Sequence, residues 1–186
     1  MQSTFEMPIP GGMAAARRIA VLLALALAAS PAALAAPSRP TVALSTLERS
    51  VLVDINTLRA KHHLAKLRFS ARLTMAARAH SQQMASEGYF AHESADGSAF
   101  WKRVQRFYAS SPWRFWSVGE NLLWSSRDID SRAALRLWWN SPEHRKNLLN
   151  PAWREIGVSA LHAVQAPGVY GGRDVIIMTT DFGVRR

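Results

Sequence analysis

The spacing of apolar residues first predicts a helix over residues 46–61. Apolar side chains recur there every three or four positions, which places them on one face of an α-helix, at Leu47, Val51, Ile55 and Leu58. Ser45 and Glu48 have the S-x-x-E pattern of a capping box, in which each residue bonds to the backbone of the other. We therefore expect the first helix of the domain to begin here.

Further helical patterns follow along the chain as far as about residue 148. The pattern over residues 71–87 follows a candidate cap at Ser70 and ends at Gly88, a residue typical of helix C-termini. Residues 99–107 have a shorter helical pattern. Asp130 or Ser131 caps a fourth helix that runs to about residue 140, and Ser141-Pro142 begins a further helical segment to about residue 148.

Strand patterns lie mainly near the end of the chain. Residues 155–164 and 174–182 are rich in β-branched side chains and are separated by Pro-Gly and Gly-Gly turns, so they should pair as antiparallel strands. Residues 116–124 are expected to form another strand, in which Gly119 marks a bulge or a close backbone approach. Helices without regular β-α alternation predict an α+β domain with layers of helix and sheet.

The N-terminal segment has the pattern of an export signal. Arg17 and Arg18 precede an apolar run over residues 19–29, and Ala33-Leu34-Ala35 resembles a cleavage site. This predicts a cleaved signal peptide over residues 1–35, a linker over 36–44 and one domain over 45–186, located in the periplasm or outside the cell. An uncleaved anchor is the alternative, and no later apolar stretch has the roughly 20 residues of a transmembrane helix.

The composition narrows the classes of partner. The 186 residues carry a formal charge of +10 and contain no cysteine, which excludes disulfides and thiolate metal sites. Such a charge favours anionic surfaces, among them phospholipid headgroups and acidic wall polymers. Export counts against nucleic acid, and a basic surface that serves only solubility is equally compatible. The sequence does not indicate an oligomeric state.

Three residues on three predicted elements could share a site: His92, Glu120 and His144. Two imidazoles and one carboxylate form a suitable ligand set for zinc, with a fourth position left for water. Their spacing matches no compact metal motif, so ordinary roles stay open. His92 could bond to loop backbone, Glu120 could pair with an arginine, and His144 could be a polar residue in the first turn of a helix.

Several short motifs occur in a definite order along the chain. They are Asn56 with Arg59, Phe90-Ala91-His92, Gly119-Glu120-Asn121-Leu122, the stretch from Trp139 to Leu149, Glu155-Ile156-Gly157-Val158, and Thr180-Asp181-Phe182-Gly183. Together they cover about residues 46–183, and their order and spacing resemble those of bacterial members of the CAP superfamily, the SCP-like extracellular proteins. The resemblance implies an α-β-α sandwich, in which helices cover both faces of a small antiparallel sheet.

The resemblance also implies roles for the candidate site residues. In this family the counterparts of His92, Glu120 and His144 face one another across a cleft, and some members bind zinc there. Many animal members have a second glutamate in this cleft, which makes a set of four residues. The position of that glutamate corresponds here to Asn140 or Ser141, so the fourth member of the set is missing. Glu143 could supply that carboxylate or could be a solvated charge at a helix start.

Other motif residues are expected to support the cleft. Of two adjacent tryptophans, Trp138 and Trp139, one should fill the core and the other could line the cleft. Asn121 is a candidate for bonding to loop backbone. Arg145 is expected to pair with a carboxylate such as Glu155.

The sequence thus favours a secreted binding module whose cleft holds a divalent metal, a small polar ligand or a lipid. One alternative is a zinc-dependent hydrolase of peptide or wall material, with Glu120 as a ligand or general base. Another is a cationic protein that binds wall polymers or membranes through its surface. The resemblance implies no shared catalytic reaction, so the sequence leaves open whether the protein is an enzyme.

Overall fold

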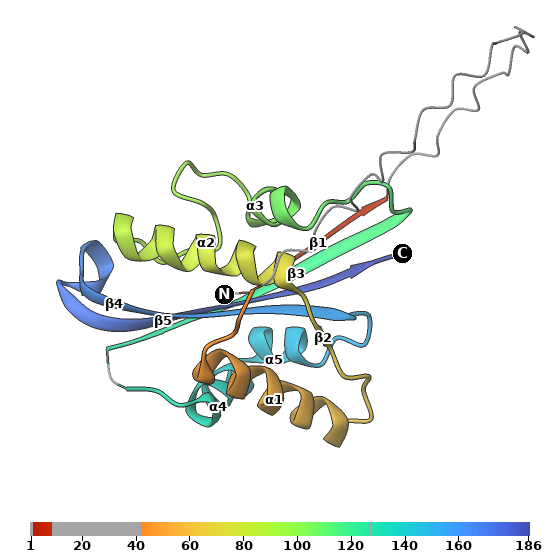
Figure 1. Ribbon diagram of the computed structural model, residues 1–186, viewed down its shortest axis with the longest axis horizontal. Coiled ribbons are helices and arrows are strands. Elements are labelled where there is room, and N and C mark those ends of the chain that lie inside the picture. The colour runs from red at the N-terminus through yellow and green to blue at the C-terminus, as the bar shows by residue number, and fades with distance from the viewer. Residues whose placement is uncertain (1, 9–41, 127) are drawn as a thin grey trace, which may run out of the picture.

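The computed structural model describes residues 2–8, 42–126 and 128–186, and Figure 1 shows helices on both sides of a central sheet. Along the chain these elements are β1 (Gln2–Pro8), α1 (Thr46–Lys61), β2 (Arg68–Phe69), α2 (Ala71–Glu87), α3 (Phe100–Phe107), β3 (Phe115–Ser125), α4 (Ser131–Asn140), α5 (Pro142–Leu148), β4 (Glu155–Ala166), a 3-10 turn (Gly168–Tyr170) and β5 (Arg173–Arg185). The predicted α-β-α sandwich of the α+β class is confirmed.

The sheet has the strand order β1-β3-β5-β4-β2. The last strand, β5, therefore lies at its centre and pairs antiparallel with both β3 and β4. The three long strands expected from the sequence are confirmed and are each a few residues longer. Two further strands, β1 and β2, were not predicted: β1 pairs antiparallel with the outer edge of β3, and the two-residue β2 runs parallel to β4.

Helix boundaries follow the local signals in the sequence. Ser45 and Glu48 form the complete capping box at the start of α1. Gly88 ends α2 in the left-handed conformation, at φ 71°. Asp130, rather than Ser131, caps α4, because its carboxylate accepts a hydrogen bond from the backbone of Ala133. These caps satisfy backbone groups that a helix end would otherwise leave unpaired.

The expected signal peptide over residues 1–35 lies outside the described residues, apart from the seven residues of β1. The expected linker over residues 36–44 is described only from residue 42 onward. Within the described ranges, no helix has the length and apolar character needed to cross a membrane.

The helices divide into two layers, each with its own hydrophobic core. Helices α1, α4 and α5 lie on one face of the sheet, whereas α2 and α3 lie on the other (Figure 1). On the first face the buried side chains of α1 and α4 pack on strand residues around Trp153 and Phe182. On the second face α2 and α3 pack on Trp116 and Val118. Because strand side chains alternate, β3 contributes to both cores, with Trp116 and Val118 on the second face and Leu123 on the first.

Two glycines permit close contact between the layers. A Cβ atom at Gly157 would lie 2.1 Å from the backbone carbon of Leu73, so α2 packs directly against the backbone of β4 there. At Gly119 it would lie 2.7 Å from the side-chain oxygen of Asn147, which confirms the close approach expected at this residue.

We predict that Gly157→Ala destabilises the protein by about 1–3 kcal/mol or more, because α2 must move to make room for the methyl group. Urea unfolding of purified variants measures the effect. Gly97→Asn is the matched control: a Cβ at Gly97 meets nothing within 4 Å, and asparagine tolerates its positive φ. Equal stability of the two variants would contradict the close contact between α2 and β4.

Candidate functional site

The predicted site residue Glu120 lies in the middle of β3 and is completely buried. Its side chain lies on the α2 and α3 face of the sheet, where both carboxylate oxygens are bound. Oε1 lies 2.7 Å from Nδ1 of His92, and Oε2 accepts a hydrogen bond of 2.6 Å from Nη2 of Arg103. The structure therefore brings two of the three predicted site residues together and adds an arginine to them.

Arg103 connects Glu120 to the loop that carries His92. This loop follows α2, whereas Arg103 is on α3. Nη1 of Arg103 donates to the backbone oxygen of His92 at 3.2 Å and to the hydroxyl of Ser94 at 3.1 Å. Since a carboxylate can only accept, Nδ1 of His92 carries the proton of its bond to Glu120. The two side chains thus hold the loop against β3, and Nε2 of His92 is left buried without a hydrogen-bond partner.

Opposing electrostatic effects act on the carboxyl of Glu120. Burial alone would raise its pKa, but the charge of Arg103 and the hydrogen bond from His92 hold the pKa below its ordinary value. Glu120 is therefore ionised at neutral pH. Asp181 lies directly opposite on β5, and burial together with the charge of Glu120 raises its pKa well above the ordinary value. Two neighbouring buried carboxyls thus carry one charge between them.

A second histidine, His80 on α2, completes this buried group. Its Nε2 donates to the backbone oxygen of Ala91 at 2.9 Å and lies 4.0 Å from Oε1 of Glu120. Burial lowers the pKa of His80 to about 4, so its ring is neutral at physiological pH. The side chain of His80 is fully buried.

The third predicted site residue, His144, belongs to the opposite layer. Its backbone oxygen accepts a hydrogen bond of 3.1 Å from Asn121. Because Glu120 and Asn121 are adjacent in a strand, their side chains lie on opposite faces of the sheet. Asn147 of α5 bonds to both, through the backbone oxygen of Glu120 and the side chain of Asn121. Asn121 thus bonds to backbone, as expected, but to helix α5 rather than to a loop.

This arrangement does not fit a divalent metal ion. Both oxygens of Glu120 are engaged by protein donors, and the nearby guanidinium of Arg103 would repel a cation. In residues 2–8, 42–126 and 128–186, no three His, Cys, Asp or Glu side chains form a group that could hold one. The expected zinc site therefore depends on the family resemblance alone.

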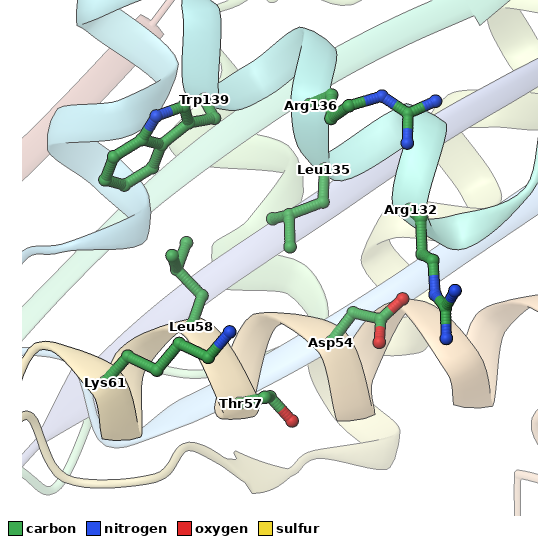
Figure 2. Close-up of a pocket in the computed structure, with 8 residues that line it drawn as sticks. All are labelled: Asp54, Thr57, Leu58, Lys61, Arg132, Leu135, Arg136 and Trp139. Carbon is green, nitrogen blue, oxygen red and sulfur yellow. The ribbon is translucent and has the colours of Figure 1, made fainter.

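The remaining predicted residues lie around α4 and α5. Trp138 fills the core, whereas Trp139 is half-buried and lines a groove between α1 and α4 (Figure 2). Glu143 is exposed in the first turn of α5. The expected pairing of Arg145 with Glu155 is wrong: Arg145 donates to the backbone oxygen of Trp139 and lies over its ring, because the short link between α4 and α5 brings them together.

A polar cleft of about 750 Å³ opens beside the buried group, between α2, α3 and the loop after His92. Its lining includes Gln82 and Gln83 of α2, Ser94 and Ser98 of the loop, and Arg103 and Arg106 of α3. Sequence patterns did not single out Arg103 or Arg106, because isolated arginines on a basic chain carry no motif. The arginine that neutralises Glu120 also lines this cleft.

The layered fold is that of a domain of the SCP type. The CAP family model, described as the cysteine-rich secretory protein family, matches residues 52–171. The chain belongs to this family, as the sequence resemblance indicated.

Two relatives from Bacillus subtilis are similar over this region. The uncharacterized membrane protein YlbC is 33% identical over 114 residues, which are 61% of this chain and 31% of the relative. The uncharacterized protein YkwD is 32% identical over 115 residues, which are 62% of this chain and 42% of the relative. The matched region thus spans less than half of either relative.

Solved structures support the same fold. An outer surface protein from Borrelia burgdorferi has a TM-score of 0.62 at 21% identity, over 74% of this chain and 92% of that chain. An extracellular protein containing a SCP domain from Bacillus anthracis has a TM-score of 0.57 at 27% identity, over 78% of this chain and 45% of that chain.

We predict that Arg103→Met lowers the free energy of unfolding at pH 7 by about 3–5 kcal/mol, because Glu120 is left as a poorly compensated buried charge. In the wild-type protein the lowered pKa of Glu120 contributes stability that is fully present above the ordinary pKa of 4.5 and is lost as the pH falls through the pKa of the folded state. The difference in unfolding free energy between variant and wild type should therefore be smaller at pH 4 than at pH 7.

Urea unfolding at both pH values measures this gap. Arg106→Met, an exposed position on the same helix, is the control and should stay within about 0.5 kcal/mol of wild type. A gap of equal size at pH 7 and pH 4 would show that Arg103 does not hold the charge of Glu120.

Asp181→Asn tests the protonated carboxyl. The pKa of Asp181 is higher in the folded protein than in the unfolded chain, where it is about 3.8. The protonated carboxyl therefore contributes stability that is fully present below pH 3.8 and is lost as the pH rises through the pKa of the folded state. Wild type should therefore lose up to about 1.4 kcal/mol per pH unit from this group over that window. The variant should lose less between pH 5 and pH 8, as measured by urea unfolding. Asp128→Asn, which is exposed, should keep the wild-type slope.

Proposed function

We propose that the protein is an exported binding module whose polar cleft between α2 and α3 takes a small polar ligand. The observation that supports this proposal most directly is the cleft itself. Its lining includes Arg103, which also donates a hydrogen bond to the buried carboxylate of Glu120. Its volume of about 750 Å³ lies within the range of about 300–1,000 Å³ that is common for ligand sites.

The charges of the cleft favour a neutral or zwitterionic ligand. Arg103 is engaged by Glu120, whereas Arg106 is an exposed cation at the rim. The carboxylates of Glu87 and Asp96 line the same cleft and offset this positive charge. Amides and hydroxyls make up much of the remaining polar lining, and they both donate and accept hydrogen bonds. N-acetylated amino sugars and short peptides have this chemistry.

The buried group supports binding rather than catalysis. Nδ1 of His92 and both oxygens of Glu120 are engaged with one another or with Arg103. A general base must reach the proton that it removes, whereas these groups hold a loop and a helix against the sheet. They form a rigid support for the cleft, which lowers the entropy lost when a ligand binds.

Export is supported by two observations. Residues 1–35 have the charge, apolar run and small-residue motif of a signal peptide. The Bacillus anthracis protein of similar fold is described as extracellular, and that of Borrelia burgdorferi as an outer surface protein. We accordingly propose that the protein acts in the cell envelope or outside the cell.

A pair of titrations tests the proposed ligand class. N-acetylglucosamine and alanyl dipeptides are titrated calorimetrically into metal-stripped protein, and zinc is titrated separately. We expect at least one polar probe to bind and to bind about tenfold more weakly to Gln82→Ala or Arg106→Gln, because each change removes about 1.4 kcal/mol of polar contact. We expect no one-to-one uptake of zinc.

Arg132→Gln, on the opposite layer, is the control and should bind the polar probes as wild type does. If the cleft variants bind the probes as tightly as wild type does, the ligand site lies outside this cleft. One equivalent of zinc that is lost in both His92→Ala and His144→Ala would instead support the metal site expected from the family resemblance.

A further inference from the structure

A second surface feature, the α1–α4 groove, lies in the layer opposite the polar cleft. Figure 2 shows its lining, in which α1 contributes Asp54, Thr57, Leu58 and Lys61, and α4 contributes Arg132, Leu135, Arg136 and Trp139. Each set has the spacing i, i+3, i+4, i+7, so one face of each helix borders the groove. Its volume is about 510 Å³.

The charges of this groove are unbalanced, in contrast to those of the polar cleft. Three cationic side chains, Lys61, Arg132 and Arg136, border it, and all three are exposed. Asp54 is the single acidic residue of the lining, and its Oδ2 already accepts a hydrogen bond of 2.6 Å from the hydroxyl of Ser131. In the described part of the chain, no carboxylate forms an ion pair with any of the three cations.

The two arginines are spaced for repeated anionic groups. Arg132 and Arg136 are one turn apart on α4, which separates their backbones by about 6 Å along the helix. A guanidinium presents a planar set of donors that matches the oxygens of a phosphate group. Lys61 adds a third charge from the facing helix, so consecutive phosphates of one chain can be met from both sides of the groove.

The groove also offers an apolar surface between these charges. Leu58 and Leu135 contribute apolar side chains to the lining. Trp139 is held in place from two neighbouring segments, because the guanidinium of Arg145 lies 5.4 Å from its ring centre and the ring of His62 also lies at 5.4 Å. A fixed aromatic ring suits the C–H surface of a sugar or polyol unit.

From these features we propose that the α1–α4 groove binds a phosphodiester-linked polyol polymer. Lys61, Arg132 and Arg136 bind its phosphates, and Trp139 contacts the polyol units between them. This site is independent of the polar cleft, since the two lie on opposite layers of the sandwich and have different charge. Such a polymer would retain the protein in a phosphate-rich envelope while the polar cleft stays accessible.

The test is calorimetric titration of a synthetic glycerol-phosphate oligomer into the purified protein over a series of salt concentrations. Three phosphate contacts predict a slope of log K against log salt of about −2. The double variant Arg132→Gln/Arg136→Gln should bind about tenfold more weakly at about 0.15 M salt and should lose most of this slope.

A second double variant, Arg72→Gln/Arg114→Gln, is the matched control. It has the same net charge, and its two exposed arginines, on α2 and just before β3, border neither the α1–α4 groove nor the polar cleft, so it should bind the oligomer as wild type does. Trp139→Phe should weaken binding while leaving the salt slope unchanged, because it alters no charge.

Several results would overturn the proposal. These are failure of the oligomer to bind, and equal weakening in both double variants, which would indicate a general effect of charge. Single-stranded DNA bound as tightly as the oligomer would show that the polyol units are not recognised. Vesicles of phosphatidylglycerol that bind through the groove when the oligomer does not would assign the groove to a membrane surface. None of these results depends on whether the polar cleft binds its own ligand.

Discussion

The structure around the candidate site depends on one buried charge, the carboxylate of Glu120. Water cannot reach it, so the protein must supply the hydrogen bonds that an ionised carboxylate needs. Arg103 of α3 and His92 of the loop after α2 supply them. A single charged side chain on β3 thus fixes both the third helix and the loop between the second and third helices, and the wall of the polar cleft is a consequence of that pairing.

The residue next to it, Asn121, has the same role on the other face of the sheet. Through Asn147 and the backbone of His144 it ties α5 to β3. Glu120 and Asn121 therefore attach opposite layers of the sandwich to the same strand. Each of the two residues thus has a structural role that requires its position in β3, and the two histidines of the predicted site, His92 and His144, lie in different layers.

Local patterns were sufficient to predict most of the fold. The capping box at Ser45 and the terminal glycine of α2 mark helix ends through bonds between near neighbours, and β-branched residues separated by turn residues mark the last two long strands. The site was harder to predict. The pairing of Glu120 with Arg103 spans 17 residues and that with His92 spans 28, and neither separation leaves a periodic signal. Asp181 lies in one of the motifs noted in the sequence, but its protonation could not be predicted there because it depends on burial and on Glu120 across the sheet.

The central position of β5 also constrains how the molecule assembles. Both long antiparallel pairings of the sheet are made by the last strand, Arg173–Arg185, so the other strands have no common partner until those residues are present. The first helix is similarly dependent on late residues, because buried Arg59 donates to the backbone oxygens of Leu148 and Asn150. Contacts between distant parts of a chain slow folding. The sheet therefore cannot be completed until β5 has been synthesised.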